Sequence, residues 1–332
     1  MHSIDPVWEE RSDRLDFQFG PYTLCRVPLK VLALQTNAFV ASPDLEVPLD
    51  EAIRQGYQAA VKYGTPINLN FPAIRIQGGS LRYVPRYGHR YVVDLEGSFR
   101  EYLRKFSKKA RGNLQRTVKK IVQASGGFAD FREYRSPSEI MAFRDIAIAI
   151  SRRSYKKDIG WGFQEGEDFA RRLESDAASG TVRGYVLMLD GEPAAYVFCR
   201  IDHDVIVYKH IGYDDRFAEH SPGTALLYLL LERLFEECEF RVLDFDNGEY
   251  YPYKEFFATR AVRCARVVWF RPTARNLALV IAHWVVTASW RVASALRGLT
   301  RRSRREWVSV QWVSVRPHIA QSRRSSRSNL AQ

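Results

Sequence analysis

The sequence from Gly212 to Phe235, GYDDRFAEHSPGTALLYLLLERLF, limits the fold of this chain more than any other stretch. Its second half is apolar on most sides, which predicts a buried helix. Pro222 suits the first helical position, because the amide hydrogen that proline lacks would have no partner there, and Ser221 is expected to cap the helix with its side chain. Strand-like runs precede and follow this helix, so it is expected to cover a sheet.

Charge is distributed unevenly along the 332 residues, which are enough for two domains. The net charge is +12, but the stretch from Arg271 to Gln332 holds 12 arginines and one acid, Glu306. This stretch therefore carries +11, and the rest of the chain carries about +1. A protein that binds nucleic acid through its folded body is expected to have a basic body, so no nucleic-acid partner is expected here.

The first part of the chain reads as a mixture of short strands and helices. Residues 17–27 and 72–77 are predicted to be strands, and residues 50–64 a helix. From Phe99 to Val122, apolar residues recur every three or four positions, which predicts one long helix with a basic outer face. Ser125, Gly126 and Gly127 then interrupt the pattern, so we expect an N-terminal α/β domain over residues 1–122.

The second part shows a clearer order of elements. Ser136, Pro137 and Glu139 form the start signal of a helix over residues 136–155. The predicted order begins with a strand at 128–134, helices at 136–155 and 167–180, and strands at 182–190, 192–202 and 204–214. The apolar helix, a strand at 241–246, a helical turn near Lys254 and a strand at 264–270 follow. This order predicts an α/β domain with a mixed sheet over residues 123–272.

The start of the apolar helix is the first candidate site. Gly223 and Thr224 are expected to present free amide groups at the positive end of the helix dipole, where phosphate or pyrophosphate binds well. Glycine has no side chain that would keep a ligand away. The alternative is that Ser-Pro only begins an ordinary helix.

The second candidate site is the stretch VLDFDNGEYYPYKEFF, which begins at Val242. Asp244 and Asp246 lie two apart on a predicted strand and should therefore face the same side. A carboxylate can accept a proton from an amine, Tyr253 can donate one to a leaving thiolate, and Lys254 can stabilise an anion. The alternative is a solvated acidic loop with an ordinary ion pair.

Three motifs together resemble the GNAT acyltransferases, and within them the CelD/BcsL-like branch linked to cellulose and exopolysaccharide production, which is related to the FemAB-like transferases. The likeness spans roughly residues 90–270. It rests on the YDDRFAEHSPG stretch, on DFDNGEYYPYKEFF, and on a basic segment with Ser107, Lys108, Arg111, Asn113 and Arg116. The resemblance implies a GNAT-like mixed twisted sheet flanked by helices and preceded by a smaller, degenerate GNAT-like domain. The family has glycine where this chain has Asp246.

The resemblance also implies the ligands. Acetyl-CoA or another acyl-CoA would be the co-substrate, with its pyrophosphate on the Ser221–Pro222 turn and the amides of Gly223, Thr224 and Ala225. The pantetheine would lie along Tyr208, His210 and Ile211. The acceptor would be a small molecule or glycan, and Arg111 and Arg116 could contact an acidic one. The resemblance thus implies an acetyltransferase of exopolysaccharide or cell-envelope intermediates.

Other interpretations stay open. A FemAB-like transferase would use aminoacyl-tRNA, which the nearly neutral body argues against. A non-catalytic GNAT-like scaffold is favoured by Asp246. His210 has the alternative of an ordinary histidine satisfied within a sheet. The histidines show no metal-binding spacing, so no metal is expected.

The last part, residues 273–332, combines an apolar helix with a basic end. Leu277–Trp290 contains His283 as its one ionisable residue and is short for a membrane span. Apolar, tryptophan-containing and arginine-flanked segments suit a helix that lies on an anionic membrane; the alternative is a helix that covers the core. The N-terminus lacks an apolar signal sequence and the four cysteines form no pair motif, so a cytoplasmic protein, with peripheral membrane contact as an option, is expected.

Overall fold

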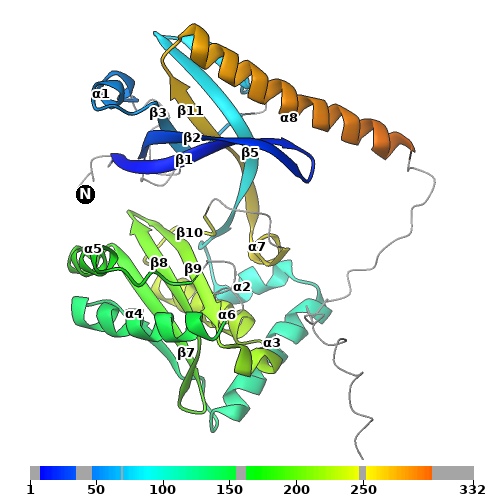
Figure 1. Ribbon diagram of the computed structural model, residues 1–332. Helices are drawn as coiled ribbons and strands as arrows, with labels where there is room; N and C mark the ends of the chain where they lie inside the picture. Colours follow the sequence, from blue (N-terminus) through cyan, green and yellow to red (C-terminus); the bar gives the residue numbers. More distant parts are fainter. Residues whose placement is uncertain (1–7, 35–46, 69, 155–161, 247–251, 301–332) are drawn as a thin grey trace, which may run out of the picture.

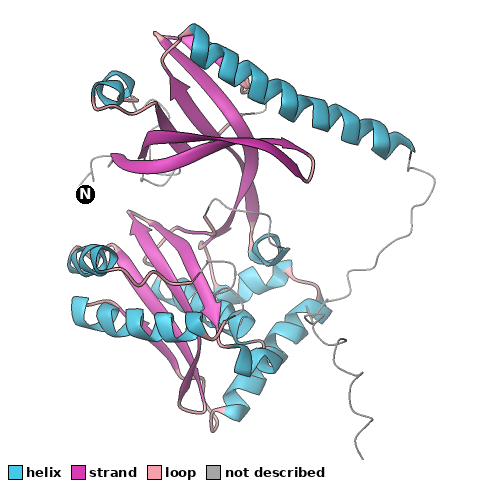
Figure 2. Ribbon diagram, in the orientation of Figure 1, coloured by secondary structure: helices cyan, strands magenta, loops and turns pink. Residues whose placement is uncertain are grey.

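The computed structural model describes residues 8–34, 47–68, 70–154, 162–246 and 252–300. In this part of the chain, the strands form one sheet in the order β1-β2-β3-β11-β5-β10-β9-β8-β7-β6, with β4 paired to β5 alone. Figure 1 shows an upper half around β1, β2, β3, β5 and β11 and a lower half around β7–β10. Helices flank the sheet, as Figure 2 makes plain. The predicted mixed, helix-flanked sheet is confirmed.

The bounds of the elements are as follows. The strands are β1 (Trp8–Phe19), β2 (Tyr22–Leu34), β3 (Ala59–Pro66), β4 (Ile74–Gln77), β5 (Ser80–Asp94), β6 (Phe131–Tyr134), β7 (Val182–Leu189), β8 (Glu192–Asp202), β9 (Val205–Tyr213), β10 (Val242–Asp244) and β11 (Arg260–Phe270). The helices are α1 (Leu49–Arg54), α2 (Phe99–Tyr102), α3 (Lys108–Ala124), α4 (Pro137–Arg152), α5 (Glu167–Ala178), α6 (Pro222–Glu237), α7 (Pro252–Phe257) and α8 (Ala274–Thr300), with 3-10 turns at Leu103–Lys105 and Asp215–His220 (η3).

The lower half is a sheet covered on both faces. Alternate residues of β7 point to opposite sides, as in any strand: Tyr185 and Leu187 join one core, Val186 and Met188 the other. The first core is closed by α2, α3 and α6, and the second by α4 and α5. All residues of β7 are buried, which explains why its sequence, apart from Arg183, is apolar without alternation.

The upper half is completed by the end of the chain. Strand β11 lies between β3 and β5, antiparallel to both, and α8 packs on β1 and β5. Leu15, Val31, Leu81 and Phe270 form a core that Val280 of α8 closes from above. This half therefore contains segments from both ends of the sequence (Figure 1).

Strand β5 connects the two halves. Its Val92 pairs with Arg260 of β11 on one side and with Asp244 of β10 on the other. Val122, the end of the predicted first domain, lies inside α3, which packs on α6 of the lower half. The division into residues 1–122, 123–272 and 273–332, with a degenerate GNAT-like first domain, stays a prediction.

Three predicted elements are wrong in extent, each for a local reason. The strand at 17–27 is two strands, because Gly20 turns the chain with φ +64°. The helix at 50–64 ends at Arg54, Gly56 adopts φ +85°, and the following residues enter the sheet as β3. The helix at 99–122 is interrupted at Phe106, which is extended, and Ser107 then caps α3 by accepting from the amide of Ala110.

The elements of the second part are confirmed with shifts of a few residues at their ends. Ser136 and Glu139 form the predicted capping box of α4, and Pro137 occupies its first turn.

In the first part of the chain, strand β5 was not predicted. Pro85, Gly88 and its charged residues are untypical of a strand, although this one has 15 residues.

The apolar helix near the C-terminus, α8, covers the core of the upper half, which was one of the two predicted alternatives. Leu277, Val280 and Val286 pack against this core. Of the described helices, none is both long and apolar enough to cross a membrane. The basic end, residues 301–332, lies outside the described residues.

His283 fixes α8 to β1 and β5 and should make stability depend on pH. Its Nδ1 lies 2.5 Å from the hydroxyl of Tyr83 and its Nε2 lies 3.1 Å from the carbonyl oxygen of Asp16. Burial lowers the pKa of His283, so below neutrality the unfolded chain binds a proton more readily than the folded one. The folded protein is therefore fully stabilised above the ordinary pKa of histidine. This stability is lost as the pH falls from that pKa toward the lower pKa of His283 in the folded protein.

We expect the melting temperature to fall between pH 7 and pH 5, and this fall to be smaller in His283→Gln, which cannot titrate there. Thermal unfolding followed by circular dichroism at each pH would measure it. The exposed His89 provides the control, since His89→Gln should retain the full pH dependence. Equal pH dependence in His283→Gln and the unchanged protein would contradict the assignment.

Candidate active site

The junction between β9 and α6 confirms a helix start but corrects the predicted capping. Pro222 occupies the first turn of α6. Ser221 adopts the left-handed conformation (φ 52°, ψ 51°), and its side chain makes no capping hydrogen bond. Residues that cap a helix in this way ordinarily have an extended backbone, and the left-handed conformation of Ser221 departs from it. The Ser221 carbonyl instead accepts from the amides of Thr224 at 3.1 Å and Ala225 at 3.2 Å.

The amide of Gly223 differs from its neighbours. Free amides were predicted at Gly223 and Thr224, and the resemblance added the Ala225 amide as a pyrophosphate contact. In the structure, Thr224 and Ala225 already donate to Ser221, and Ala225 is fully buried. Within the described part of the chain, Gly223 donates to no backbone or side-chain oxygen. A Cβ atom at Gly223 would lie 3.8 Å from Tyr213 and 3.9 Å from Ile211. The end of β9 and the start of α6 therefore meet at Gly223.

The 3-10 turn η3, which links β9 to α6, is held in place by a buried carboxylate. Asp214 is fully buried, accepts from the Arg216 amide at 3.0 Å, and forms ion pairs with Arg216 and Arg153. Burial raises the pKa of Asp214, but hydrogen bonds from Arg216 outweigh this and lower it overall. Asp214, the aspartate of the Tyr-Asp pair in the motif, thus holds the turn that leads to Gly223.

The second candidate site is a cluster of buried charges around Arg90 of β5. Arg90 forms two hydrogen bonds with Asp244, one of them from Nε at 3.3 Å, and an ion pair with Asp246 at 3.5 Å. The side chains of Arg90 and Asp244 are 4% and 0% exposed. Asp244 and Asp246 share this cation, as expected for neighbouring carboxylates. Asp244, however, is fully enclosed by the protein and pairs with Arg90, so it is not accessible as a base.

Asp246 occupies a backbone conformation that favours glycine. Strand β10 ends at Asp244, so Asp246 is not on the strand as predicted, and its φ is +59°. Aspartate tolerates this conformation better than most residues. Its amide donates to Asp244 at 3.0 Å and its carboxylate accepts from Lys209 at 2.8 Å. Its side chain is 28% exposed, so it is the carboxylate of the pair that reaches solvent.

A bulge in β9 brings Lys209 to Asp246. Phe198 of β8 pairs with His210, and the next residue, Cys199, pairs with Tyr208, so Lys209 is the extra residue. A bulge re-aims side chains and commonly lies beside an active site. Three cations and two carboxylates thereby converge where β5, β9 and β10 meet: Arg90, Lys209, Lys254, Asp244 and Asp246.

Tyr253 and Lys254 come from α7 and reach the same place. Lys254 is buried and donates to the carbonyl of Phe245 at 2.8 Å. Burial lowers the pKa of Lys254, and the nearby Asp246 and Asp244 oppose that effect. The Tyr253 ring packs against Phe245 and Tyr208 of β9, and burial raises the pKa of Tyr208. Predicted residues from β9, β10 and α7 are thus brought together.

The other predicted residues lie outside this cluster. His210 is half-buried, with its ring 5.8 Å from that of Phe163 and 6.3 Å from that of Phe198, on the α4–α5 side of the sheet. Arg116 is exposed and donates to Asn113 at 2.6 Å, one helical turn before it. Arg111 is half-buried on α3. The turn Asn247-Gly248 lies outside the described residues.

Sequence reasoning missed Arg90, Lys209 and Asp214. Arg90 lies on a strand that was not predicted, and no local pattern links it to Asp244 across 154 positions. Lys209 was assigned to a regular strand, because nothing in the sequence indicates the bulge. Asp214 was within a quoted motif, and its place directly before a helical turn could have indicated a cap.

Comparison with known proteins bears on the segment that carries this site. Residues 108–255 match the family described as acetyltransferase (GNAT) domain. This segment is therefore similar to a GNAT domain. It contains α3 to α6, β6 to β10 and the first part of α7. The α6 start and Asp246 therefore lie within it, while Arg90 lies before it. No curated protein matches the sequence.

Solved structures resemble more of the chain than this segment. The C-terminal domain of a protein described as a lysylphosphatidylglycerol synthetase from Agrobacterium fabrum aligns with 77% of this chain and 82% of its own, at 12% identity and a TM-score of 0.50. FemX aligns with 83% and 90% at 10% identity and a TM-score of 0.49. L-PGS from Bacillus licheniformis aligns with 78% and 85% at 12% identity and a TM-score of 0.46. The first of these supports a shared fold beyond the GNAT-type segment.

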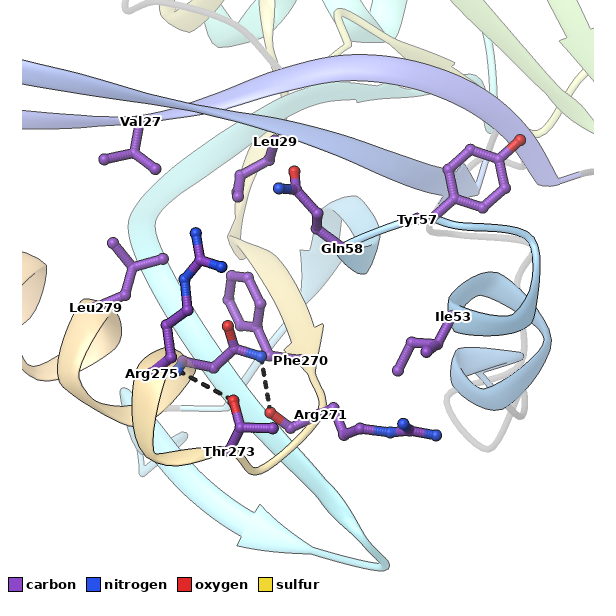
Figure 3. A pocket seen from close by; sticks show the side chains of 11 residues that line it. Val27, Leu29, Ile53, Tyr57, Gln58, Phe270, Arg271, Thr273, Arg275 and Leu279 are labelled. Atoms are coloured by element: carbon purple, nitrogen blue, oxygen red, sulfur yellow. Dashed lines mark hydrogen bonds between the residues drawn. The ribbon is translucent and has the colours of Figure 1, made fainter.

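A pocket of about 240 Å³ lies elsewhere, between β2, the α1–β3 connection, β11 and the start of α8 (Figure 3). It contains none of the predicted site residues. Arg271 and Arg275 contribute to its wall, and Thr273 accepts from the Asn276 amide at 3.2 Å (Figure 3).

The described residues hold no group of three His, Cys, Asp or Glu side chains placed to bind a metal ion.

Proposed function

We propose that the protein is an acyl-CoA-dependent acyltransferase, with acetyl-CoA as the donor and an amine of a sugar or cell-envelope intermediate as the acceptor. The observation that carries the proposal is the amide of Gly223 at the first turn of α6, in a segment that matches the GNAT domain. A partly exposed helix start with an unused amide and no side chain accommodates a pyrophosphate group.

The donor would lie along the junction of β9 and α6. Its pyrophosphate would accept from the Gly223 amide, with the exposed Ser221 hydroxyl and the Thr224 side chain as further partners. Thr224 and Ala225 contribute through the helix dipole, since their amides are already used. The pantetheine would follow β9 past Ile211 toward the bulge at Lys209. The thioester would then lie near Asp246.

The chemistry would then fall to the residues around the bulge. The acceptor nitrogen attacks the thioester carbonyl carbon, the carbon–sulfur bond breaks, and the thiolate of CoA leaves. Asp246, the more exposed carboxylate, would take the proton of the acceptor, directly or through water, and Tyr253 would protonate the thiolate. Arg90 and Asp244 would position Asp246, and buried Lys254 would favour negative charge nearby.

The acceptor is proposed on the resemblance to the CelD/BcsL-like branch and on the basic residues of α3. Arg111 and Arg116 lie on a helix that packs against α6 and η3, so an acidic sugar acceptor could approach the donor from this side. The proposal includes no metal and no nucleic-acid partner. A FemAB-like transferase that uses aminoacyl-tRNA and a scaffold without activity are the alternatives that the experiment must separate.

Replacing Gly223 with glutamate is expected to weaken acetyl-CoA binding at least about tenfold without unfolding the protein. A Cβ at Gly223 meets only ordinary contacts, and a carboxylate at a helix start is compatible with the dipole, so the fold should persist. The carboxylate would occupy the pyrophosphate position and repel it. Calorimetric titration of the full chain should show binding that weakens at least about tenfold, equivalent to about 1.4 kcal/mol, in the variant.

Gly166→Glu is the matched control. Gly166 is the N-cap of α5, has open space around its Cβ position, and receives the same added charge at another helix start. It should bind acetyl-CoA as the unchanged protein does. Absence of binding in all three proteins would refute an acyl-CoA donor, and salt-sensitive tRNA binding would then favour the aminoacyl alternative. Binding without transfer to any amine acceptor would favour the scaffold.

A further inference from the structure

The outer face of α8 is apolar, although it faces solvent. The opposite face packs on β1 and β5, as described above. Away from that contact, Ile281, Trp284 and Val285 are 45%, 44% and 46% exposed. A helix that covers a core on one side ordinarily carries charged residues on the other. Here no charged residue occurs between Arg275 and Arg291 except the buried His283, if protonated.

The tip of the β1–β2 hairpin extends this apolar surface. Phe19, Tyr22 and Leu24 are 37%, 71% and 62% exposed. The Phe19 ring lies 5.1 Å from that of Trp290, edge to face, so the tip lies beside the C-terminal part of α8. Gly20 permits this approach, because a Cβ there would lie 2.5 Å from the Trp290 ring atom Cζ2. Figure 1 shows the hairpin reaching toward the far part of α8.

Together, Phe19, Tyr22, Leu24, Ile281, Trp284 and Val285 are called the α8 apolar surface. Of the eight large apolar side chains described as exposed in this chain, six belong to it; the others are Ile76 and Phe128. Exposed apolar residues scattered singly need no explanation, but a concentration of them on adjacent elements marks an interaction site.

Basic residues on both sides of the α8 apolar surface indicate what it contacts. Arg271 and Arg275 are exposed at the N-terminal end of α8. The sequence places arginine at positions 291, 297, 301, 302, 304 and 305 at and beyond the other end, and residues 271–332 carry +11. Two copies of this chain would bring like charges together, which disfavours self-association. An anionic surface fits both the apolar and the basic parts.

We propose that the α8 apolar surface docks the protein on an anionic phospholipid membrane, with Trp284 and its neighbours in the interface and Arg271 and Arg275 at the headgroups. Helices of this composition lie in the plane of the interface, and anionic lipid strengthens their binding. No described helix spans a membrane, so the contact is peripheral. The proposal is independent of the acyl donor.

Sedimentation of the full chain with lipid vesicles tests the proposal. Vesicles of phosphatidylcholine mixed with phosphatidylglycerol should bind the protein, vesicles of phosphatidylcholine alone should bind it much less, and added salt should weaken binding. Trp284→Asp and Ile281→Asp should each lower binding to the anionic vesicles by about tenfold. Both positions are exposed, so circular dichroism and acetyl-CoA titration should give unchanged results.

Phe128→Asp is the control, because Phe128 is 64% exposed in the loop before β6 of the lower half, and it should bind vesicles like the unchanged protein. Equal binding by Trp284→Asp and the unchanged protein, or no binding to anionic vesicles at all, overturns the proposal. If the unchanged protein is instead dimeric and Ile281→Asp is monomeric, the surface is an interface between copies and the membrane proposal fails.

Discussion

Arg90→Met is expected to lower the free energy of unfolding by about 3–5 kcal/mol, because it leaves the carboxylate of Asp244 buried without its cation. Methionine fills much of the volume of the arginine stem, so the lost free energy of unfolding comes mainly from the missing charge and not from a cavity. The Asp244 side chain is fully buried, and water cannot replace the missing partner. Urea unfolding followed by circular dichroism would measure the change.

Adding Asp244→Asn to Arg90→Met should restore part of the loss. The asparagine carries no charge and keeps an oxygen that can accept from the Asp246 amide. Arg241→Met is the control, since the Arg241–Asp204 pair is about half exposed on both sides and should contribute at most about 1 kcal/mol. If Arg90→Met costs no more than this control, Arg90 is not the electrostatic partner that we describe.

Removing α8 is the second change with a large expected effect. A chain of residues 1–272 would expose Leu15, Val31, Leu81 and Phe270, which are 0–1% exposed beneath the helix. Full burial of one large apolar side chain contributes about 1.5–3 kcal/mol, and a whole domain is stable by only about 5–15 kcal/mol. We therefore expect the shortened chain to lose the packed upper half and to aggregate.

A chain that ends at Thr300 tests whether this effect belongs to the helix. It retains α8 and removes the basic end, so it should elute as the full chain does in size-exclusion chromatography and melt at a similar temperature. A stable, monomeric 1–272 chain with an unchanged melting temperature would contradict the role of α8 as the cover of the core. It also follows that ligand titrations should use the complete chain.

Sequence patterns predicted the lower half well, because its elements are local. Strands β7–β9, helix α6 and the capped start of α4 each carry their own signal, such as the Asp190-Gly191 turn, where both residues have positive φ. The upper half was predicted poorly because tertiary contacts decide it. Residues 59–64 were predicted to belong to the helix at 50–64, yet they lie in β3 between β2 and β11.

The candidate site shows the same division. Gly223, Asp246, Tyr253 and Lys254 stand out as residue types in a motif, and the resemblance assigned roles to them. The use of the Thr224 and Ala225 amides, the bulge at Lys209 and the buried Arg90 depend on conformation and on long-range pairing. No periodicity in the sequence encodes these features, so they could not be foreseen.

The position of β11 has a consequence for synthesis of the chain on the ribosome. Of the described strands, β11 is the last to be made, and it fills the space between β3 and β5, which end at residues 66 and 94, well over 150 residues before β11 begins at residue 260. Until it emerges, the edges of β3 and β5 lack a partner and the apolar faces below α8 stay uncovered. Unpaired strand edges favour aggregation. Nascent chains should therefore depend on chaperones late in translation, and slow codons before β11 should lower the yield of folded protein.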